Sequence, residues 1–178
     1  MLEGLQELEK SKKCHNDLKP ENVLYKFSDE TYENGDRKIV IKIGDFGTAD
    51  RSGGTPGWTW PRFLSQRKPG RSDMYSTGLL ILYVMCESRD LFYRLRDNYI
   101  QGLQPCMDDF RKHPLIELVI NMMGLKLSVE QCLYRWNEVS DYVKFLTVSD
   151  LCMDYRIPRY CFDTQAPYKI ANATILDR

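Results

Sequence analysis

The sequence predicts an α+β domain that is mainly helical and carries one small β-hairpin. Residues 1–13 repeat leucine at every third position among charged and amide side chains, which is typical of an amphipathic helix. Residues 23–27 and 39–43 are rich in β-branched and aromatic side chains and predict two strands. Residues 74–87 are apolar on nearly all sides, as in a central buried helix, and 115–123 form a further apolar stretch.

Polar residues mark the ends of the predicted helices. Ser72 or Asp73 is expected to cap the central helix, because both side chains accept hydrogen bonds from free backbone N–H groups. Ser128 followed three residues later by Gln131 has the form of a capping box, and it predicts a helix that continues through Val143.

The segment between the two strand candidates is polar and contains Asn34-Gly35, a strong hairpin signal. Antiparallel pairing sets the start of the first strand beside the end of the second. Asn22 directly precedes the first strand, and Asp45 follows the second. We therefore expect the hairpin to bring Asn22 and Asp45 together, although they lie far apart in the sequence.

Four side chains around this hairpin carry groups that suit phosphoryl transfer. The carboxylate of Asp17 can accept a proton from an incoming hydroxyl, and Lys19 can neutralise charge on a transferring phosphoryl group. Asn22 and Asp45 offer oxygen ligands of the kind that Mg²⁺ prefers. Because phosphoryl transfer depends mostly on positioning and charge stabilisation, a base, a cation and two metal ligands are the parts it needs.

The run HNDLKPEN at 15–22, followed by DFG at 45–47, resembles the catalytic loop and the D-F-G motif of eukaryotic protein kinases. The K-P-E-N version resembles the serine/threonine branch. The resemblance covers about residues 1–145 and implies a protein-kinase-like C-lobe, in which a helical lobe bears a small β-hairpin with the catalytic and DFG loops. It implies a C-lobe domain over 1–148 and a C-terminal tail over 149–178.

The resemblance implies ATP and Mg²⁺ as cofactors and a protein Ser/Thr hydroxyl as acceptor of the γ-phosphate. Asp17 would be the base that orients this hydroxyl, and Lys19 would contact the γ-phosphate. Asn22 and Asp45 would hold the metal. Leu24 is expected either to pack against its neighbours or also to touch the adenine ring from below.

Further residues are expected to support this site. The run DMYSTG resembles the family motif D-x-Y-S-x-G, whose aspartate bonds to the backbone of the catalytic loop, so Asp73 is expected to hold His15 and Asp17 from behind. Phe46, within the D-F-G motif, is also assigned to structural support.

The run GTPGW resembles the end of a kinase activation segment. Thr55 lies where the family places a threonine that hydrogen-bonds near the catalytic Asp17 and Lys19. Trp58 is expected to line the groove for the residue after the acceptor, or alternatively to bury its ring against the core.

Three departures from the family pattern bear on activity. Asn16 replaces the arginine that receives an activation-loop phosphate in many kinases, and the segment 47–54 is short. Arg62 stands in place of the A-P-E glutamate, and its expected partner position holds Lys126, so the family's ion pair is absent or replaced.

Neither a Gly-x-Gly-x-x-Gly loop nor a V-A-I-K strand precedes the motifs. We therefore expect a C-lobe without the N-lobe that covers the phosphates in this family.

Two functions follow from these observations. The first is a partial Ser/Thr protein kinase domain, with a protein substrate and an N-lobe from a longer chain as partners. The alternative is a catalytically weak or inactive pseudokinase-like module that binds or regulates a partner. The presence of all four residues that suit phosphoryl transfer favours the first function. The departures from the family pattern and the missing N-lobe motifs favour the second.

Composition narrows the expected binding partners and the cellular compartment. Lys plus Arg and Asp plus Glu each number 25, which argues against bulk attraction to nucleic acid or to an anionic membrane. The six cysteines are scattered and include no Cys-x-x-Cys pair, as in a reduced protein. No apolar run is as long as a membrane span, and the start lacks the apolar core of a signal peptide, so we expect a cytoplasmic protein.

Overall fold

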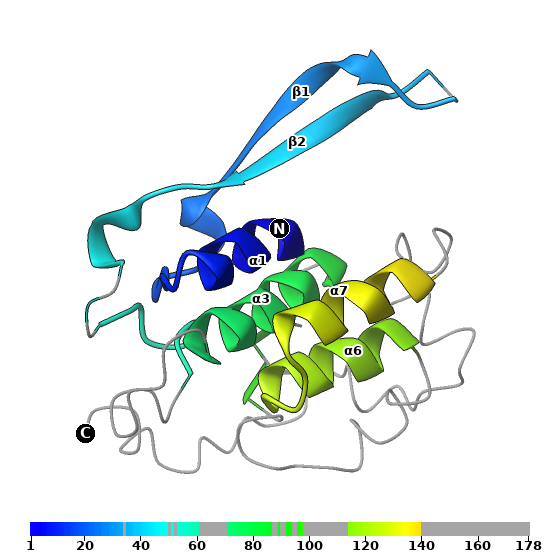
Figure 1. Cartoon of the computed structure of the whole chain (residues 1–178). Coiled ribbons are helices and arrows are strands. Elements are labelled where there is room, and N and C mark those ends of the chain that lie inside the picture. Colours follow the sequence, from blue (N-terminus) through cyan, green and yellow to red (C-terminus); the bar gives the residue numbers. More distant parts are fainter. Residues whose placement is uncertain are drawn as a thin grey trace.

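A computed structural model shows a body of packed helices that carries a two-stranded hairpin (Figure 1). The structure describes residues 1–33, 35–49, 51, 53–60, 71–86, 89, 92–93, 96–97 and 114–139. The predictions for Arg62 and for the tail lie outside these ranges. The helix predicted to continue through Val143 is shorter than expected, because it ends at Glu138 and Val139 is extended (φ −69°, ψ 124°). The described elements are α1 (Leu2–Lys10), the 3₁₀ helix η1 (Pro20–Asn22), β1 (Val23–Thr31), β2 (Arg37–Ile43), the 3₁₀ helix η2 (Phe46–Thr48), α3 (Arg71–Met85), α6 (Pro114–Met123) and α7 (Val129–Glu138).

The predicted hairpin is present, and its strands are longer than expected. β1 and β2 pair antiparallel, with Val23 opposite Ile43, and after an irregularity the pairing continues to Thr31 opposite Arg37. Gly35 lies in the connecting turn at φ 86°, which a glycine adopts without strain. The polar outer part of each strand has no apolar alternation, so the sequence pattern revealed only the inner part.

The base of the hairpin docks on the helical body. Gly44 donates a backbone hydrogen bond to the carbonyl of Asn22 over 2.8 Å, which closes the base. Val23 and Ile43 are partly buried against the core. A Cβ added to Gly4 of α1 would lie 3.3 Å from Ile43 Cδ1, so the helix and the strand approach closely. This docking fixes the loops that flank the hairpin.

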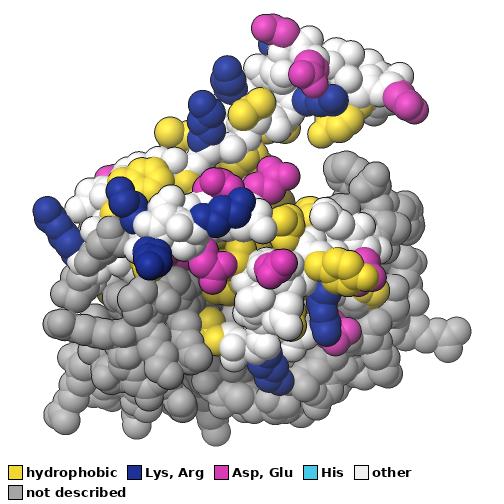
Figure 2. Space-filling model, viewed as in Figure 1, with side chains coloured by type: hydrophobic (Ala, Val, Ile, Leu, Met, Phe, Trp, Pro, Cys, Tyr) yellow, Lys and Arg dark blue, Asp and Glu magenta, His cyan; other side chains and the backbone are white. Residues whose placement is uncertain are grey.

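The distal part of the hairpin stands away from the helices. Alternation along paired strands sets Tyr25, Phe27, Ile39 and Ile41 on one face of the sheet. These four residues are 50–70% exposed. Figure 2 shows acidic side chains gathered at the tip and open space beneath this part of the hairpin. The hairpin therefore presents an exposed apolar face.

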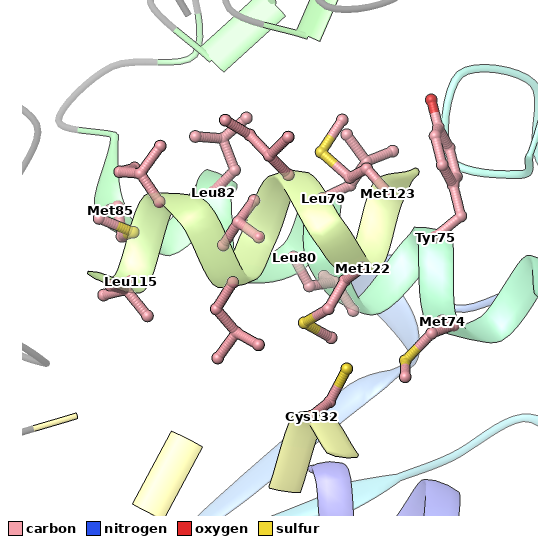
Figure 3. Packing of buried hydrophobic residues seen from close by; sticks show 14 of the residues in the cluster. Met74, Tyr75, Leu79, Leu80, Leu82, Met85, Leu115, Met122, Met123 and Cys132 are labelled. Atoms are coloured by element: carbon pink, nitrogen blue, oxygen red, sulfur yellow. The ribbon is translucent and has the colours of Figure 1, made fainter. Parts of the chain in front are cut away.

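The core is formed by α3 and α6, with α7 packed beside them. Figure 3 shows the buried side chains of α3 and α6 interleaved, and the thiol of Cys132 on α7 pointing toward them. A Cβ on Gly78 of α3 would lie 2.9 Å from Met123 Cγ and 3.2 Å from the Val119 carbonyl oxygen. The close approach of these two helices therefore requires a glycine at position 78.

One of the two predicted helix caps is present in the structure, and the other is not. The capping box is confirmed, because Ser128 Oγ accepts from Gln131 N and Gln131 Oε1 accepts from Ser128 N. The cap predicted at Ser72 or Asp73 is wrong, because α3 begins at Arg71 and includes both residues. The carboxylate of Asp73 instead faces a neighbouring loop.

None of the helices in the described ranges is long and apolar enough to span a membrane.

Candidate active site

Residues 14–18, in the loop between α1 and η1, are buried and are held from behind by α3. Asp73 accepts two backbone hydrogen bonds, from His15 N to Oδ2 and from Asn16 N to Oδ1, each 2.7 Å long. Asp73 itself is 3% exposed. A carboxylate so far from water is stabilised by these N–H donors, and in return it fixes the backbone just before Asp17.

His15 connects this loop to the loop after β2. Its Nδ1 accepts from the backbone N–H of Asp17 over 3.3 Å, which leaves Nε2 as the donor to the Gly44 carbonyl over 2.8 Å. The ring also meets Phe46 edge to face, with 4.8 Å between ring centroids. His15, Phe46 and Asp73 thus form one continuous support for the two loops, although Phe46 is itself half exposed.

Asp17, Lys19 and Thr55 form a closed polar network. Asp17 Oδ1 accepts from the backbone N–H and from the hydroxyl of Thr55, both at 2.7 Å. Lys19 Nζ lies 3.0 Å from Asp17 Oδ2 and donates to Thr55 Oγ1 over 2.8 Å. The structure therefore brings together three residues that lie on two separate segments of the chain.

This network lowers the pKa of Asp17. Burial alone would raise the pKa by disfavouring the charged form, but the hydrogen bonds from Thr55 and Lys19 and the charge of Lys19 outweigh it. The carboxylate is consequently ionised at neutral pH and ready to accept a hydrogen bond.

Asn22 and Asp45 flank the hairpin base. Asn22 Nδ2 donates to the carbonyl oxygen of Asp17 over 2.8 Å, so the amide oxygen points away from that contact. Asp45 is exposed, adopts φ 54°, and uses Oδ1 to accept from Gly47 N in its own turn. Because Gly44 bonds to the Asn22 carbonyl, both side chains leave the sheet at the same end.

This pair fits a magnesium ion in donor chemistry. An amide oxygen and a carboxylate are hard ligands, and Mg²⁺ commonly takes one or two protein ligands and completes its octahedron with water and phosphate oxygens. Within the described ranges no group of three or more His, Cys, Asp or Glu side chains could hold a metal. A site here would therefore depend on Asn22 and Asp45 together with ligands from outside the protein.

Leu24 lies at the exposed surface beside this pair. It is 56% exposed, and its Cδ1 would lie only 2.8 Å from a Cβ on Gly44. Its side chain covers the Gly44 backbone on one side and is open to contact on the other.

Trp58 is buried. It is 8% exposed, stacks on Phe92 with 5.2 Å between ring centroids, and meets Tyr83 edge to face. Its carbonyl also accepts from Ser76 Oγ on α3 over 2.7 Å. This packing corresponds to the burial alternative for Trp58, and it anchors the Thr55 loop to the core.

Sequence reasoning missed how Asn16 is used. This residue adopts φ 69°, which asparagine tolerates better than most residues, and Nδ2 donates to the Arg51 carbonyl over 3.0 Å. A Cβ on Gly54 would lie 2.6 Å from the Asn16 carbonyl oxygen. Asn16 therefore ties the catalytic loop to the segment after DFG. The signal available in the sequence was the asparagine itself, a residue type that adopts positive φ more readily than most.

Arg96 was missed as well. Its guanidinium lies 4.8 Å from the ring centroid of Tyr93 and pairs with Asp97 over 2.8 Å. A Cβ on Gly57 would lie 2.7 Å from Arg96 Nη1, so this arginine packs against the turn after Thr55. These contacts are tertiary, and no local pattern in the sequence indicates them.

Comparison with known families agrees with this geometry, since a model described as the protein kinase domain matches residues 1–157. The chain belongs to the protein kinase domain family. Its resemblance to the eukaryotic Ser/Thr protein kinases is thereby confirmed.

Three curated relatives are calcium/calmodulin-dependent protein kinases type 1. The chain is 34% identical to that of Macrobrachium nipponense over 161 residues, covering 86% of this chain and 39% of the relative. It is 28% identical to that of Caenorhabditis elegans over 156 residues, covering 84% and 37%. It is 34% identical to that of Caenorhabditis briggsae over 161 residues, covering 86% and 38%. The chain thus spans less than two fifths of the length of these relatives.

Proposed function

We propose that this chain is the C-lobe of a Ser/Thr protein kinase domain, and that the domain transfers the γ-phosphate of ATP to a protein hydroxyl. The observation that carries the proposal is the network of Asp17, Lys19 and Thr55 at the hairpin base that bears Asn22 and Asp45. The likeness to calcium/calmodulin-dependent protein kinases supports the same reaction class.

Asp17 accepts the hydrogen bond of the substrate hydroxyl and orients its oxygen toward the phosphorus. Because the pKa of Asp17 is lowered, it is a weak base and takes the proton only late in the transfer. Lys19, which is 23% exposed in its side chain and close to Asp17, compensates charge on the transferring group. Thr55 holds both side chains in position.

Asn22 and Asp45 hold Mg²⁺ in this proposal, and Leu24 contacts the adenine from below. The ion neutralises charge on the phosphates when it is bound. The open side of Asp45 and the exposed side chain of Leu24 leave these groups accessible to a nucleotide. An N-lobe from a longer chain supplies the remaining contacts and excludes water from the transfer.

The proposal is tested by titrating Mg-ATP into the purified chain while its thermal midpoint is followed. Ligand at ten times its dissociation constant stabilises the folded state by about 1.4 kcal/mol, or about 3 °C for a chain of this size. We expect this shift for the parent chain and not for Asp45→Ala.

Asp29→Ala is the matched control, because Asp29 is a fully exposed carboxylate on the hairpin away from the site. It is expected to respond as the parent does. If millimolar Mg-ATP shifts no midpoint, or shifts that of Asp45→Ala equally, the nucleotide site proposed here is excluded for this chain.

A further inference from the structure

A pocket of about 630 Å³ lies behind the catalytic loop. Its walls come from the C-terminal end of α1, the N-terminal end of α3 and the turn between α6 and α7. None of the residues proposed for phosphoryl transfer or metal binding lines it. The volume is in the range of small-molecule sites, which commonly measure about 300–1,000 Å³.

The inner wall is apolar. Leu5 and Met74 line the pocket and are 3% and 4% exposed. Leu8, Leu127 and Val129 also line it and are partly buried. Such a surface favours an apolar body, because its contact with the wall releases water from both.

The rim is cationic. Lys12 and Lys13 line the pocket from the end of α1, and Lys126 lines it from the α6–α7 turn. No ion pair or side-chain hydrogen bond joins any of these three lysines to another residue in the described ranges. Lysines after a helix C-terminus also complement the helix dipole, but that effect does not require three of them around one hollow.

The backbone holds two of these lysines in place. Lys13 N donates to the Leu8 carbonyl over 2.9 Å, and Lys126 N donates to the Asn121 carbonyl over 3.0 Å. Each bond closes the end of its helix in the manner of a Schellman motif. The rim is therefore built on two fixed helix ends, and only the lysine side chains are free to adjust to a ligand.

Acidic side chains at the pocket are too few to balance this rim. Asp73 lines the pocket, but its two oxygens accept from His15 N and Asn16 N. Glu9 is the other carboxylate among the lining residues. Three lysines against two carboxylates, one of them buried and held by the loop amides, leave an excess of one positive charge.

We propose that this pocket binds a small amphipathic anion, with its apolar body against Leu5 and Met74 and its anionic group between Lys13 and Lys126. Asp73 is shared between the pocket wall and the catalytic loop, so occupancy is transmitted to the His15 and Asn16 amides. The ligand thereby stiffens the catalytic loop from the side opposite the substrate.

The test uses 8-anilino-1-naphthalenesulfonate as the anionic probe and N-phenyl-1-naphthylamine, the same ring system without the sulfonate, as its neutral counterpart. Fluorescence titration of the full chain is expected to show tighter binding of the sulfonate. The double variant Lys13→Gln, Lys126→Gln is expected to weaken sulfonate binding by about tenfold, as for a loss of about 1.4 kcal/mol, and to leave the neutral probe unchanged.

Lys10→Gln is the matched control, because Lys10 is an exposed lysine of α1 that pairs with Glu7 and does not line the pocket. It is expected to bind both probes as the parent does. Val129→Trp fills the pocket and is expected to abolish the part of sulfonate binding that depends on Lys13 and Lys126. This variant distinguishes probe bound in the pocket from probe bound to the exposed hairpin face.

Amide hydrogen exchange supplies a second readout. Saturation with the sulfonate is expected to slow exchange at His15 and Asn16, and not in the Val129→Trp variant. Equal affinity for the two probes, an unchanged affinity after loss of the two lysines, or unaltered exchange at His15 and Asn16 would each overturn the proposal. The test uses no nucleotide, so its outcome is independent of the proposed kinase activity.

Discussion

Asp17 shows how a single carboxylate is prepared by its neighbours. Thr55 occupies Oδ1 with two donors, and Lys19 lies beside Oδ2. Both partners act on the charged form, so they lower the pKa of Asp17 against the opposing effect of burial. The same contacts that prepare the site therefore also contribute to folding.

This coupling predicts how stability responds to acid. The pKa of Asp17 is lower in the folded chain than the unfolded value of about 3.9, so the unfolded state binds more protons near pH 4 and below. The stabilisation is present above about pH 4 and is lost as the pH falls through the folded-state pKa. Thr55→Val removes the hydroxyl donor, and we expect it to cost about 1–2 kcal/mol at pH 7 and less at low pH.

Urea denaturation of both chains between neutral and acidic pH measures this difference. Thr31→Val is the matched control, since Thr31 is an exposed hairpin residue that no contact joins to Asp17 in the described ranges. Its curve should parallel that of the parent. A constant gap between the parent and Thr55→Val at all pH values would contradict the argument.

At the scale of elements, the contact between α3 and α6 depends on a missing side chain. A methyl group at Gly78 would meet the Val119 carbonyl oxygen at 3.2 Å, and backbone cannot move aside as a side chain can. At Gly4 of α1 the atoms of the described residues within 4 Å of an added Cβ, apart from the helix's own backbone and chain neighbours, belong to the flexible side chain of Ile43. Two helical glycines therefore differ in what surrounds them.

Gly78→Ala is expected to destabilise the chain by about 1–3 kcal/mol, because overpacking outweighs the gain of about 1 kcal/mol in helix propensity. Gly4→Ala gains the same propensity against a neighbour that can shift, and we expect its stability to be equal or higher. Denaturant midpoints of the two variants measure the comparison. Equal midpoints would show that the α3–α6 approach is looser than the structure indicates.

Secondary structure was predictable where a local cause determines it. The capping box needs only Ser128 and Gln131, and both the helix start and its reason could be read directly. The start of α3 could not be predicted in this way. The carboxylate of Asp73 can either cap a helix or accept hydrogen bonds from another segment, and it accepts them from the backbone of His15 and Asn16, which are distant in sequence. A residue that can cap a helix does not do so when a tertiary partner satisfies it better.

On the scale of the whole molecule, stability is expected to be unevenly distributed. α3 lies among the other helices and is buried along most of its length, whereas the outer hairpin has exposed side chains and, among the residues that the structure describes, no third strand along either edge. Amide exchange should therefore be slowest in α3, at the level of global unfolding, and faster in the outer half of β1 and β2. Slower exchange at the hairpin tip than in α3 would contradict this picture.

The site was predictable to the extent that its parts are close in sequence. Asp17, Lys19 and Asn22 lie on one loop, and the hairpin signal at Asn34-Gly35 placed Asp45 beside them. The packing of Arg96 against Gly57 was not predictable, because it joins segments whose proximity only the complete fold determines.

The exposed apolar face of the hairpin affects how identical chains associate in solution. It consists of Tyr25, Phe27, Ile39 and Ile41. Unpaired strand edges beside an apolar surface are the places where identical chains associate. The charged side chains at the hairpin tip, including the pairs Lys38–Glu30 and Arg37–Asp29, oppose such encounters by remaining hydrated. We therefore expect a higher protein concentration or ionic strength to favour association through this face, because salt screens the interactions of the exposed charges.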